Sequence, residues 1–360
     1  MNLNEVLNGI KPVNREKIES SIKKWDSVCK PLRSLGLLEE TVIKLAGAQN
    51  LIDVDIDKRA LITMCADNGI VKEGVTQTGQ EITAVVTENF TKEKATVSIM
   101  CKMAHVDLYP VDIGIYRDMD TYLNEEEGLK PFEVVNRKIA YGTKSFKEGP
   151  AMERDAAVRA ILTGINLVKD LKDMGYKLIA TGEMGIGNTS TSSAIVSVLL
   201  NLPVEEVTGK GAGLSDEGLL KKIDVIKEGI SVNNLDNKDV LDVLSKVGGL
   251  DIAGLTGVFL GGAYYNVPIM IDGFISAVAA LIAVRMNEHV SGYIIPSHVS
   301  KEPAGKILLE ELKLKPLLTC EMCLGEGSGA VSAIPLIDMA VKVYKDMSTF
   351  REFDFEYKPL

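Results

Sequence analysis

The sequence predicts an α/β fold built on a mostly parallel, doubly wound β-sheet. Continuous apolar runs that end in polar residues alternate along the chain with helical stretches rich in small residues. Such runs are typical of parallel strands buried on both faces, and their alternation with helices implies βαβ units. The 360 residues are 46% hydrophobic and 25% charged, a composition typical of a globular chain with a large core.

The elements are expected in a simple order. Two mixed polar and apolar stretches, 15–29 and 39–49, predict a helical arm with Trp25 in it. The run 60–66 then ends in Asp67-Asn68-Gly69, the pattern of a buried strand that delivers polar residues at its carboxyl end. Further strands are predicted at 106–114, 176–181, 267–272 and 293–297, and helices at 192–202, 254–263, 274–286, 304–312 and 330–344. The polar segment 118–149 shows little periodicity and predicts a long loop over the active face.

Charge and cysteine content exclude several classes of partner. Forty basic and fifty acidic residues give a net charge of −10, the opposite of what a nucleic-acid backbone requires. The most apolar run, 274–284, is too short to span a bilayer, so no membrane association is expected. Five cysteines in a long chain without a signal-peptide pattern indicate reduced thiols, which predicts a cytoplasmic protein.

Many of the 32 glycines gather in clusters that precede helices. The first cluster, 181–189, follows a predicted strand, and Gly182, Gly185 and Gly187 would let backbone N–H groups approach an anion. Thr189 adds a hydroxyl at the helix start. This pattern predicts a phosphate cradle, and the alternative is a tight turn whose glycines serve packing alone. The spacing fits neither a dinucleotide fingerprint nor a Walker A loop, so neither NAD nor ATP is implied.

Two further clusters place one charged side chain each among glycines. Lys210 lies within 208–213, before a helix that begins at Ser215, and it is free to reach a phosphate or carboxylate. A solvated surface lysine is the alternative. Glu326 lies within 324–330, where minimal bulk would let a carboxylate touch a substrate and act as a general base. The alternative there is an acidic side chain that only stabilises a helix start.

The sequence predicts no metal site and no cofactor. Cys320 and Cys323 form a C-x-x-C pair, but no second pair exists to complete a zinc site. The three histidines are scattered and form no metal-binding motif, and no G-x-S-x-G nucleophile elbow occurs.

Taken together, the motifs closely resemble those of the nicotinate-nucleotide:dimethylbenzimidazole phosphoribosyltransferases, over roughly residues 31–347. The resemblance rests on the segments 66–69, 73–75, 80–83, 182–189, 209–211, 272–274, 297–298, 302–303 and 324–330. It implies a Rossmann-like mostly parallel sheet flanked by helices in a large domain at 31–310. It also implies a small helical domain from the two chain ends, 1–30 and 311–360, and a homodimer or a heterodimer with a paralogue.

The resemblance further implies the reaction and its residues. Phosphoribose would move from nicotinate mononucleotide to an aromatic base, releasing nicotinate and giving an α-riboside phosphate used in cobamide assembly. Glu326 would be the general base. The donor phosphate, ribose and nicotinate would be bound by Glu183, Gly185, Gly187, Thr189, Lys210, Gly211, Gly325 and Gly327.

Two departures from the family pattern fall where the acceptor would bind. Asn68 stands where typical members have histidine, and Thr76 to Gln80 replaces a Ser-x-Tyr-Pro-Gln-like stretch. The predicted acceptor-binding residues are Asp67, Asn68, Thr76 and Gln80. The acceptor therefore stays open: it is dimethylbenzimidazole, a purine, or a phenolic compound (phenol or p-cresol) used by a heterodimer. A non-catalytic subunit that stabilises a paralogue is a further alternative. A pyrophosphate-activated donor is disfavoured, because its paired-acid motif is missing.

Overall fold

Six parallel strands form a single sheet in the order β3-β2-β1-β4-β5-β6. This computed structural model describes residues 2–119, 122–123 and 128–353. The strands are β1 (Arg59–Ala66), β2 (Asp107–Gly114), β3 (Val135–Asn136), β4 (Leu178–Met184), β5 (Ile269–Met270) and β6 (Ile294–Ile295). The predicted α/β class is confirmed, and strand order reverses direction between β1 and β4.

β1 is the central strand, and all eight of its residues are buried. Ile62 pairs with Tyr109 on β2 and with Thr181 on β4. Because both faces of a parallel sheet are covered, alternate residues of β1 enter different cores. Ile62 and Met64 belong to one hydrophobic cluster, and Leu61 and Cys65 belong to the other.

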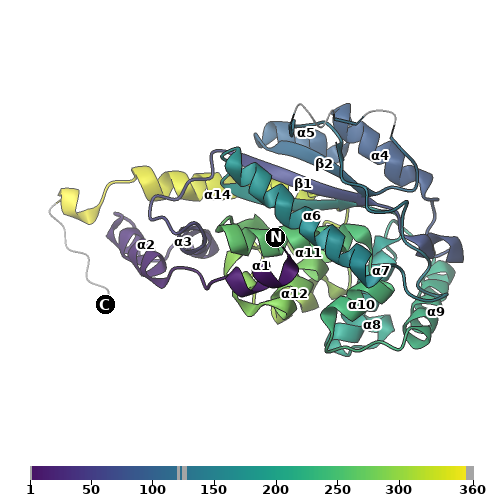
Figure 1. Cartoon of the computed structure of the whole chain (residues 1–360). Coiled ribbons are helices and arrows are strands. Elements are labelled where there is room, and N and C mark those ends of the chain that lie inside the picture. Colours follow the sequence, from purple (N-terminus) through teal and green to yellow (C-terminus); the bar gives the residue numbers. More distant parts are fainter. Residues whose placement is uncertain (1, 120–121, 124–127, 354–360) are drawn as a thin grey trace.

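Helices cover both faces of the sheet (Figure 1). The face of Ile62 packs against α6 (Arg154–Asp173), α7 (Asn188–Leu200), α10 (Val240–Val247), α11 (Leu250–Tyr265) and α12 (Phe274–Met286). The face of Leu61 packs against α3 (Leu37–Gln49), α4 (Glu81–Thr91), α5 (Thr96–Met103) and α14 (Ser328–Asp346). The fold also contains the short helices α8 (Val204–Val207) and α13 (Ala304–Glu311), the long α9 (Asp216–Val232), and 3-10 turns at 69–73, 288–293 and 350–353.

Backbone contact joins α6 to α11 beneath the sheet. A Cβ atom at Gly257 would overlap the carbonyl oxygen of Ile161, and one at Gly164 would overlap that of Gly254. Glycine at these positions therefore lets the two helices approach more closely than side chains would allow. The close pair fixes α11, whose first turn reaches the carboxyl end of the sheet.

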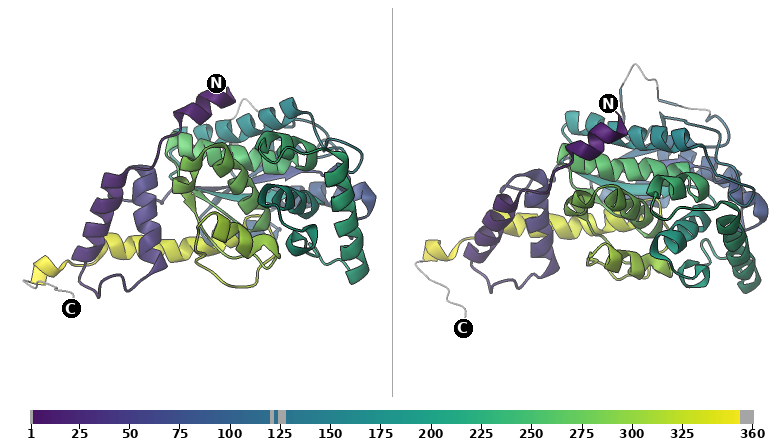
Figure 2. Two further views of the ribbon diagram at one scale, coloured as in Figure 1. Left: turned by 90° about the horizontal axis from the view of Figure 1, so that it is seen from below. Right: turned by 60° about the horizontal axis from the view of Figure 1, so that its bottom comes forward.

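The chain ends pack in two places. α2 (Arg15–Ser27) and α3 lie beside the far end of α14, where the rings of Trp25 and Tyr344 are 5.0 Å apart (Figure 2). By contrast, α1 (Leu3–Gly9) packs on α11, with Gly9 against Tyr264. The division into 31–310 and a small domain from 1–30 and 311–360 stays a prediction.

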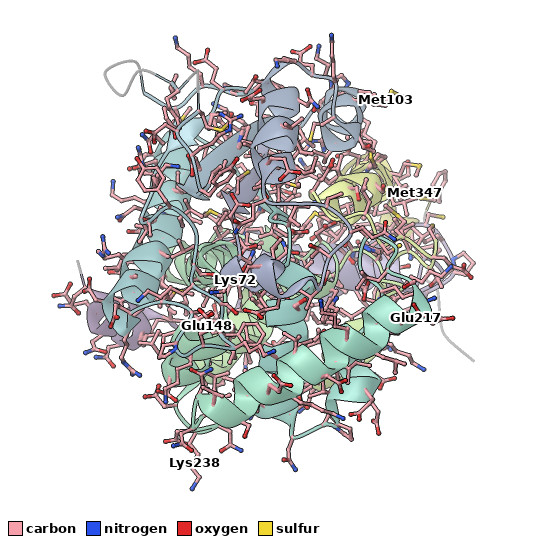
Figure 3. The ribbon with its side chains drawn as sticks, turned by 90° about the vertical axis from the view of Figure 1, so that its right-hand side faces the viewer. Lys72, Met103, Glu148, Glu217, Lys238 and Met347 are labelled. Atoms are coloured by element: carbon pink, nitrogen blue, oxygen red, sulfur yellow. The ribbon has the colours of Figure 1, made fainter. Side chains whose placement is uncertain are left out.

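All five predicted strands are present, although β5 and β6 pair over two residues each. The segment predicted as a long loop, 118–149, contains β3, and its residues 120–121 and 124–127 lie outside the described part of the chain. Its later part crosses the carboxyl end of β1, where the Thr143 N–H donates to the Asp67 carbonyl at 3.1 Å. An ion pair between Lys72 and Glu148, side by side in Figure 3, ties this segment to the 3-10 turn that follows β1.

Candidate functional site

A cavity of about 250 Å³ opens at the carboxyl ends of β4, β5 and β6. This is the edge of an open α/β sheet, beside the point where strand order reverses, at which ligands bind in such folds. Its walls come from segments far apart in the chain: 75–78, 183–189, 210–212, 272–276 and 323–326, with Lys222, His298 and Glu302. Of the predicted site residues, Glu326, Glu183, Gly185, Gly187, Thr189, Lys210, Gly211, Gly325 and Thr76 border it.

Glu326 projects from a turn of unusual backbone conformation. Gly325, Glu326 and Gly327 have φ values of 87°, 64° and 101°. Left-handed conformations are unfavourable for residues with a side chain, so this one persists only where the surroundings enforce it. The turn presses directly on β4, because a Cβ at Gly182 would overlap the Glu326 carbonyl oxygen.

The Glu326 carboxylate is half-buried and meets the first turn of α5. Its Oε2 accepts a hydrogen bond from the Val97 N–H at 3.2 Å. Burial raises the pKa of Glu326 above its usual range, and the Val97 N–H opposes that shift. A carboxylate with a raised pKa and an exposed edge toward a cavity is suited to taking up a proton near neutral pH.

Asp272 follows β5 and is 2% exposed. Its Oδ2 accepts the Gly327 N–H at 3.1 Å, and its Oδ1 accepts the N–H groups of Gly329 and Ala330 at 2.7 and 3.1 Å. These donors belong to the start of α14, where backbone N–H groups lack partners within the helix. Burial raises the pKa of Asp272 to about 7 despite the three donors.

Glu183 lies at the end of β4 within an acidic group. The Asn188 amide donates to Glu183 Oε2 and also to Asp251 Oδ2, the latter at 3.1 Å. Burial raises the pKa of Glu183 to about 8, and the negative charge of Asp251 adds to the effect. Gly325 has no side chain that could displace Glu183, since a Cβ there would overlap Glu183 Oε1.

The opposite wall is cationic. Lys222 on α9 is 1% exposed, and its ammonium donates to Thr189 Oγ1 at 2.8 Å and to the Gly209 carbonyl at 3.1 Å. Burial lowers the pKa of Lys222 to about 8, and nearby Glu302 opposes that shift. The sequence motifs did not indicate Lys222. Its one signal was its position four residues before Ile226, on the buried side of α9.

The start of α7 faces the same wall. Gly187 is its N-cap residue with φ 95°, and no side chain caps the helix. A helix N-terminus carries partial positive charge and directed N–H groups, which suits an anion. Gly211, with φ 55°, lies against Thr189, and Lys210 pairs with Asp216 at 2.6 Å while half-exposed.

Four predicted residues do not border the cavity: Gly327, Asp67, Asn68 and Gln80. Asp67 and Asn68 are fully buried beneath it. Asp67 Oδ2 accepts the Tyr116 N–H at 2.9 Å, and the Gln80 amide donates to the Asn68 carbonyl at 3.4 Å. Their predicted contact with the acceptor stays a prediction, whereas Thr76 does line the cavity.

Cys320 and Cys323 are free and exposed, and Cys323 borders the cavity. Within the described ranges, no group of three or more His, Cys, Asp or Glu side chains could hold a metal ion. A search of the same residues finds no helix with the length and apolar character needed to cross a membrane.

Comparisons with known proteins give a consistent result. Residues 10–354 match the model of a protein family described as phosphoribosyltransferase. Proteins of Ruminiclostridium cellulolyticum and Clostridium acetobutylicum, both named nicotinate-nucleotide–dimethylbenzimidazole phosphoribosyltransferase, are each 46% identical over 361 residues, covering 100% of both chains. The crystal structure of CobT from Thermus thermophilus aligns with a TM-score of 0.87 at 32% identity, over 95% of this chain and 100% of that one. The resemblance seen in the glycine-rich motifs is thus confirmed, and the chain belongs to the nicotinate-nucleotide–dimethylbenzimidazole phosphoribosyltransferase family.

Proposed function

We propose that this protein transfers the phosphoribosyl group of nicotinate mononucleotide to 5,6-dimethylbenzimidazole, for activation of the lower ligand of a cobamide. The products are nicotinate and α-ribazole 5′-phosphate. The observation that carries the proposal is that the cavity has an acidic wall opposite a cationic one. Glu326 and its acidic neighbours form one wall, and Lys222 with the start of α7 forms the other.

The cationic wall fits the donor phosphate. Lys222, Thr189 and the backbone between Gly185 and Gly187 place a buried ammonium, a hydroxyl and a helix N-terminus together. Lys210 and Gly211 border the same end of the cavity. Such an arrangement binds phosphate through charge and directed N–H groups.

The acidic wall fits the reacting centre. The N-glycosidic bond breaks with its electron pair staying on the nicotinate nitrogen, which neutralises the pyridinium. The lone pair of one benzimidazole nitrogen forms the new bond to the anomeric carbon, and Glu326 removes the proton from the other ring nitrogen. Positive charge develops on the ribose in the transition state, and the Glu326 carboxylate provides negative charge beside it.

The test is a product assay with purified enzyme, nicotinate mononucleotide and a panel of dimethylbenzimidazole, adenine and phenol. We expect transfer to dimethylbenzimidazole, and Glu326→Gln should lower kcat by about 10² to 10⁴-fold, the usual contribution of a general base. Glu321→Gln is the matched control, because Glu321 lies on the same loop, is exposed and pairs with Lys301. Transfer to phenol alone would show that the acceptor is a phenol and not dimethylbenzimidazole. Unchanged activity in Glu326→Gln would refute its role, and an inactive wild-type chain would favour the non-catalytic subunit.

We also infer a dimer in the reducing cytoplasm. The five free cysteines support the location. The dimer is supported by exposed apolar side chains on neighbouring helices: Ile99 and Met103 on α5 are 59% and 84% exposed, and Met339 on α14 is 56% exposed. Sedimentation velocity of the purified chain tests the dimer.

A further inference from the structure

Asp272 holds the backbone that directly follows Glu326 in its turn. We propose that Asp272 is a positioning residue for the transfer reaction: its carboxylate fixes the left-handed turn 325–327 and so aims Glu326 at the substrate. The inference rests on the proposed role of Glu326 as the base.

The contacts of the carboxylate lie directly after Glu326 in the chain. One oxygen accepts the N–H of Gly327, the residue directly after Glu326, and the other accepts those of Gly329 and Ala330. The turn is therefore joined to the start of α14 through a single side chain. On the other side of Glu326, Gly325 packs against Glu183, and the Glu326 carbonyl accepts Thr63 Oγ1 at 3.3 Å.

Asp272 is itself fixed by its neighbours. Its carbonyl accepts the Ser297 hydroxyl at 3.0 Å, and its N–H donates to Ser276 Oγ at 3.2 Å. Ser297 follows β6, and Ser276 belongs to the first turn of α12. The position of Glu326 is thus set from the carboxyl edge of the sheet rather than by the loop alone.

A carboxylate is needed for this arrangement. Asparagine would keep one acceptor oxygen but present an N–H₂ group to at least one backbone N–H, which places donor against donor. The turn would then shift, and displacements of about 1 Å at a reacting group can cost on the order of 10²-fold in rate.

The division between kcat and KM gives a second readout. A residue that only caps a helix contributes to stability and leaves the reacting groups in place. A residue that aims Glu326 affects the chemical step, so its loss lowers kcat while substrate binding is kept.

The experiment compares Asp272→Asn with Asp239→Asn by steady-state kinetics and urea unfolding. Asp239 caps α10 by accepting the N–H groups of Leu241 and Asp242, and it lies outside the cavity lining. We expect Asp272→Asn to lower kcat by about 10 to 100-fold with little change in KM for nicotinate mononucleotide. Asp239→Asn should lose stability and keep the kcat of the wild type.

The outcomes separate the two proposals. If Asp272→Asn loses stability but keeps the kcat of the wild type, Asp272 is only a helix cap and the inference is overturned. Full activity in Glu326→Gln would instead overturn the proposed base, whatever Asp272→Asn does. Should Asp272→Asn not fold, Ser297→Ala takes its place, since it removes the hydrogen bond to the Asp272 carbonyl. A kcat reduced severalfold at unchanged KM then supports the inference, and an unchanged kcat refutes it.

Discussion

Single residues in this protein are most informative where a charge is buried with neutral hydrogen-bond partners. Lys222 donates to a hydroxyl and a carbonyl, both neutral, although it is 1% exposed. By comparison, the buried Lys30 forms an ion pair with Glu39 at 2.6 Å. A buried cation with neutral partners is costly to the empty protein, and binding an anionic group offsets that cost.

Lys222→Met tests this interpretation, because methionine keeps most of the side-chain volume and removes the charge. We expect KM for nicotinate mononucleotide to rise by about 10 to 100-fold, the range for losing a hydrogen bond to a charged group. The unfolding midpoint in urea should change little, since the cost of burying the ammonium and its attraction to nearby Glu302 are lost together. The control is Lys227→Met on the same helix, where Lys227 pairs with Glu205 at the surface. An unchanged KM in Lys222→Met would place the phosphate elsewhere.

Helices in this protein are positioned by backbone contact as much as by side chains. α11 runs beneath β1 and lies against α6 through glycines on both helices. Its first turn carries Asp251, which shares the Asn188 amide with Glu183. The packing of two helices thus sets the floor of the site.

Gly257→Ala should therefore destabilise the fold. The added Cβ would overlap the Ile161 carbonyl oxygen, and separating the helices should cost about 1–3 kcal/mol, as overpacking usually does. Alanine forms helices more readily than glycine, so a net loss of stability reflects the close approach of α6 and α11. Gly218→Ala on α9 is the control, because its Cβ would meet the side chains of Leu214 and Ser215 rather than another helix. Equal urea midpoints for the two variants would contradict the expectation.

Local pattern was sufficient for the strands and for the turn of Glu326. β1 is an almost continuous apolar run, β2 and β4 are largely apolar, and Glu326 stands between glycines. The 20-residue α6 also has a clear pattern, with Ile161, Ile165 and Val168 on one side, yet it was not among the predicted helices.

Contacts between distant segments could not be predicted in this way. The Val97 N–H on Glu326, the three donors on Asp272 and the burial of Lys222 depend on the tertiary arrangement. α5 has only eight residues, too few for a strong periodic signal.

The whole molecule carries several carboxyl groups that burial makes hard to ionise. Burial raises the pKa of Glu183 to about 8, of Asp272 to about 7, and of Asp251 and Asp67 to about 6. The folded state therefore binds more protons than the unfolded state between about pH 4 and pH 8. Stability is lost as pH rises through this window, the opposite of the trend for carboxylates in ion pairs.

We expect the urea midpoint of the ligand-free protein to be higher at pH 5.5 than at pH 7.5. Glu183→Gln should reduce the difference, because it removes the group with the highest of these carboxyl pKa values. Exposed carboxylates with lowered pKa values, such as Asp216 and Asp239, titrate below this range and should not obscure it. Replacing the exposed Glu311 by glutamine is the control. A midpoint that rises with pH would contradict the raised pKa values of these buried carboxyl groups.

The cavity is assembled from segments between Val75 and Glu326 that meet only when the sheet and both helical layers are in place. A substrate bound there contacts all of these segments at once and has no equivalent site in an unfolded chain. Its binding free energy is therefore added to the stability of the native state, by RT ln(1 + [L]/Kd). We therefore expect the cellular supply of the proposed donor, nicotinate mononucleotide, to affect how long each copy of the protein survives proteolysis, as well as how fast it works.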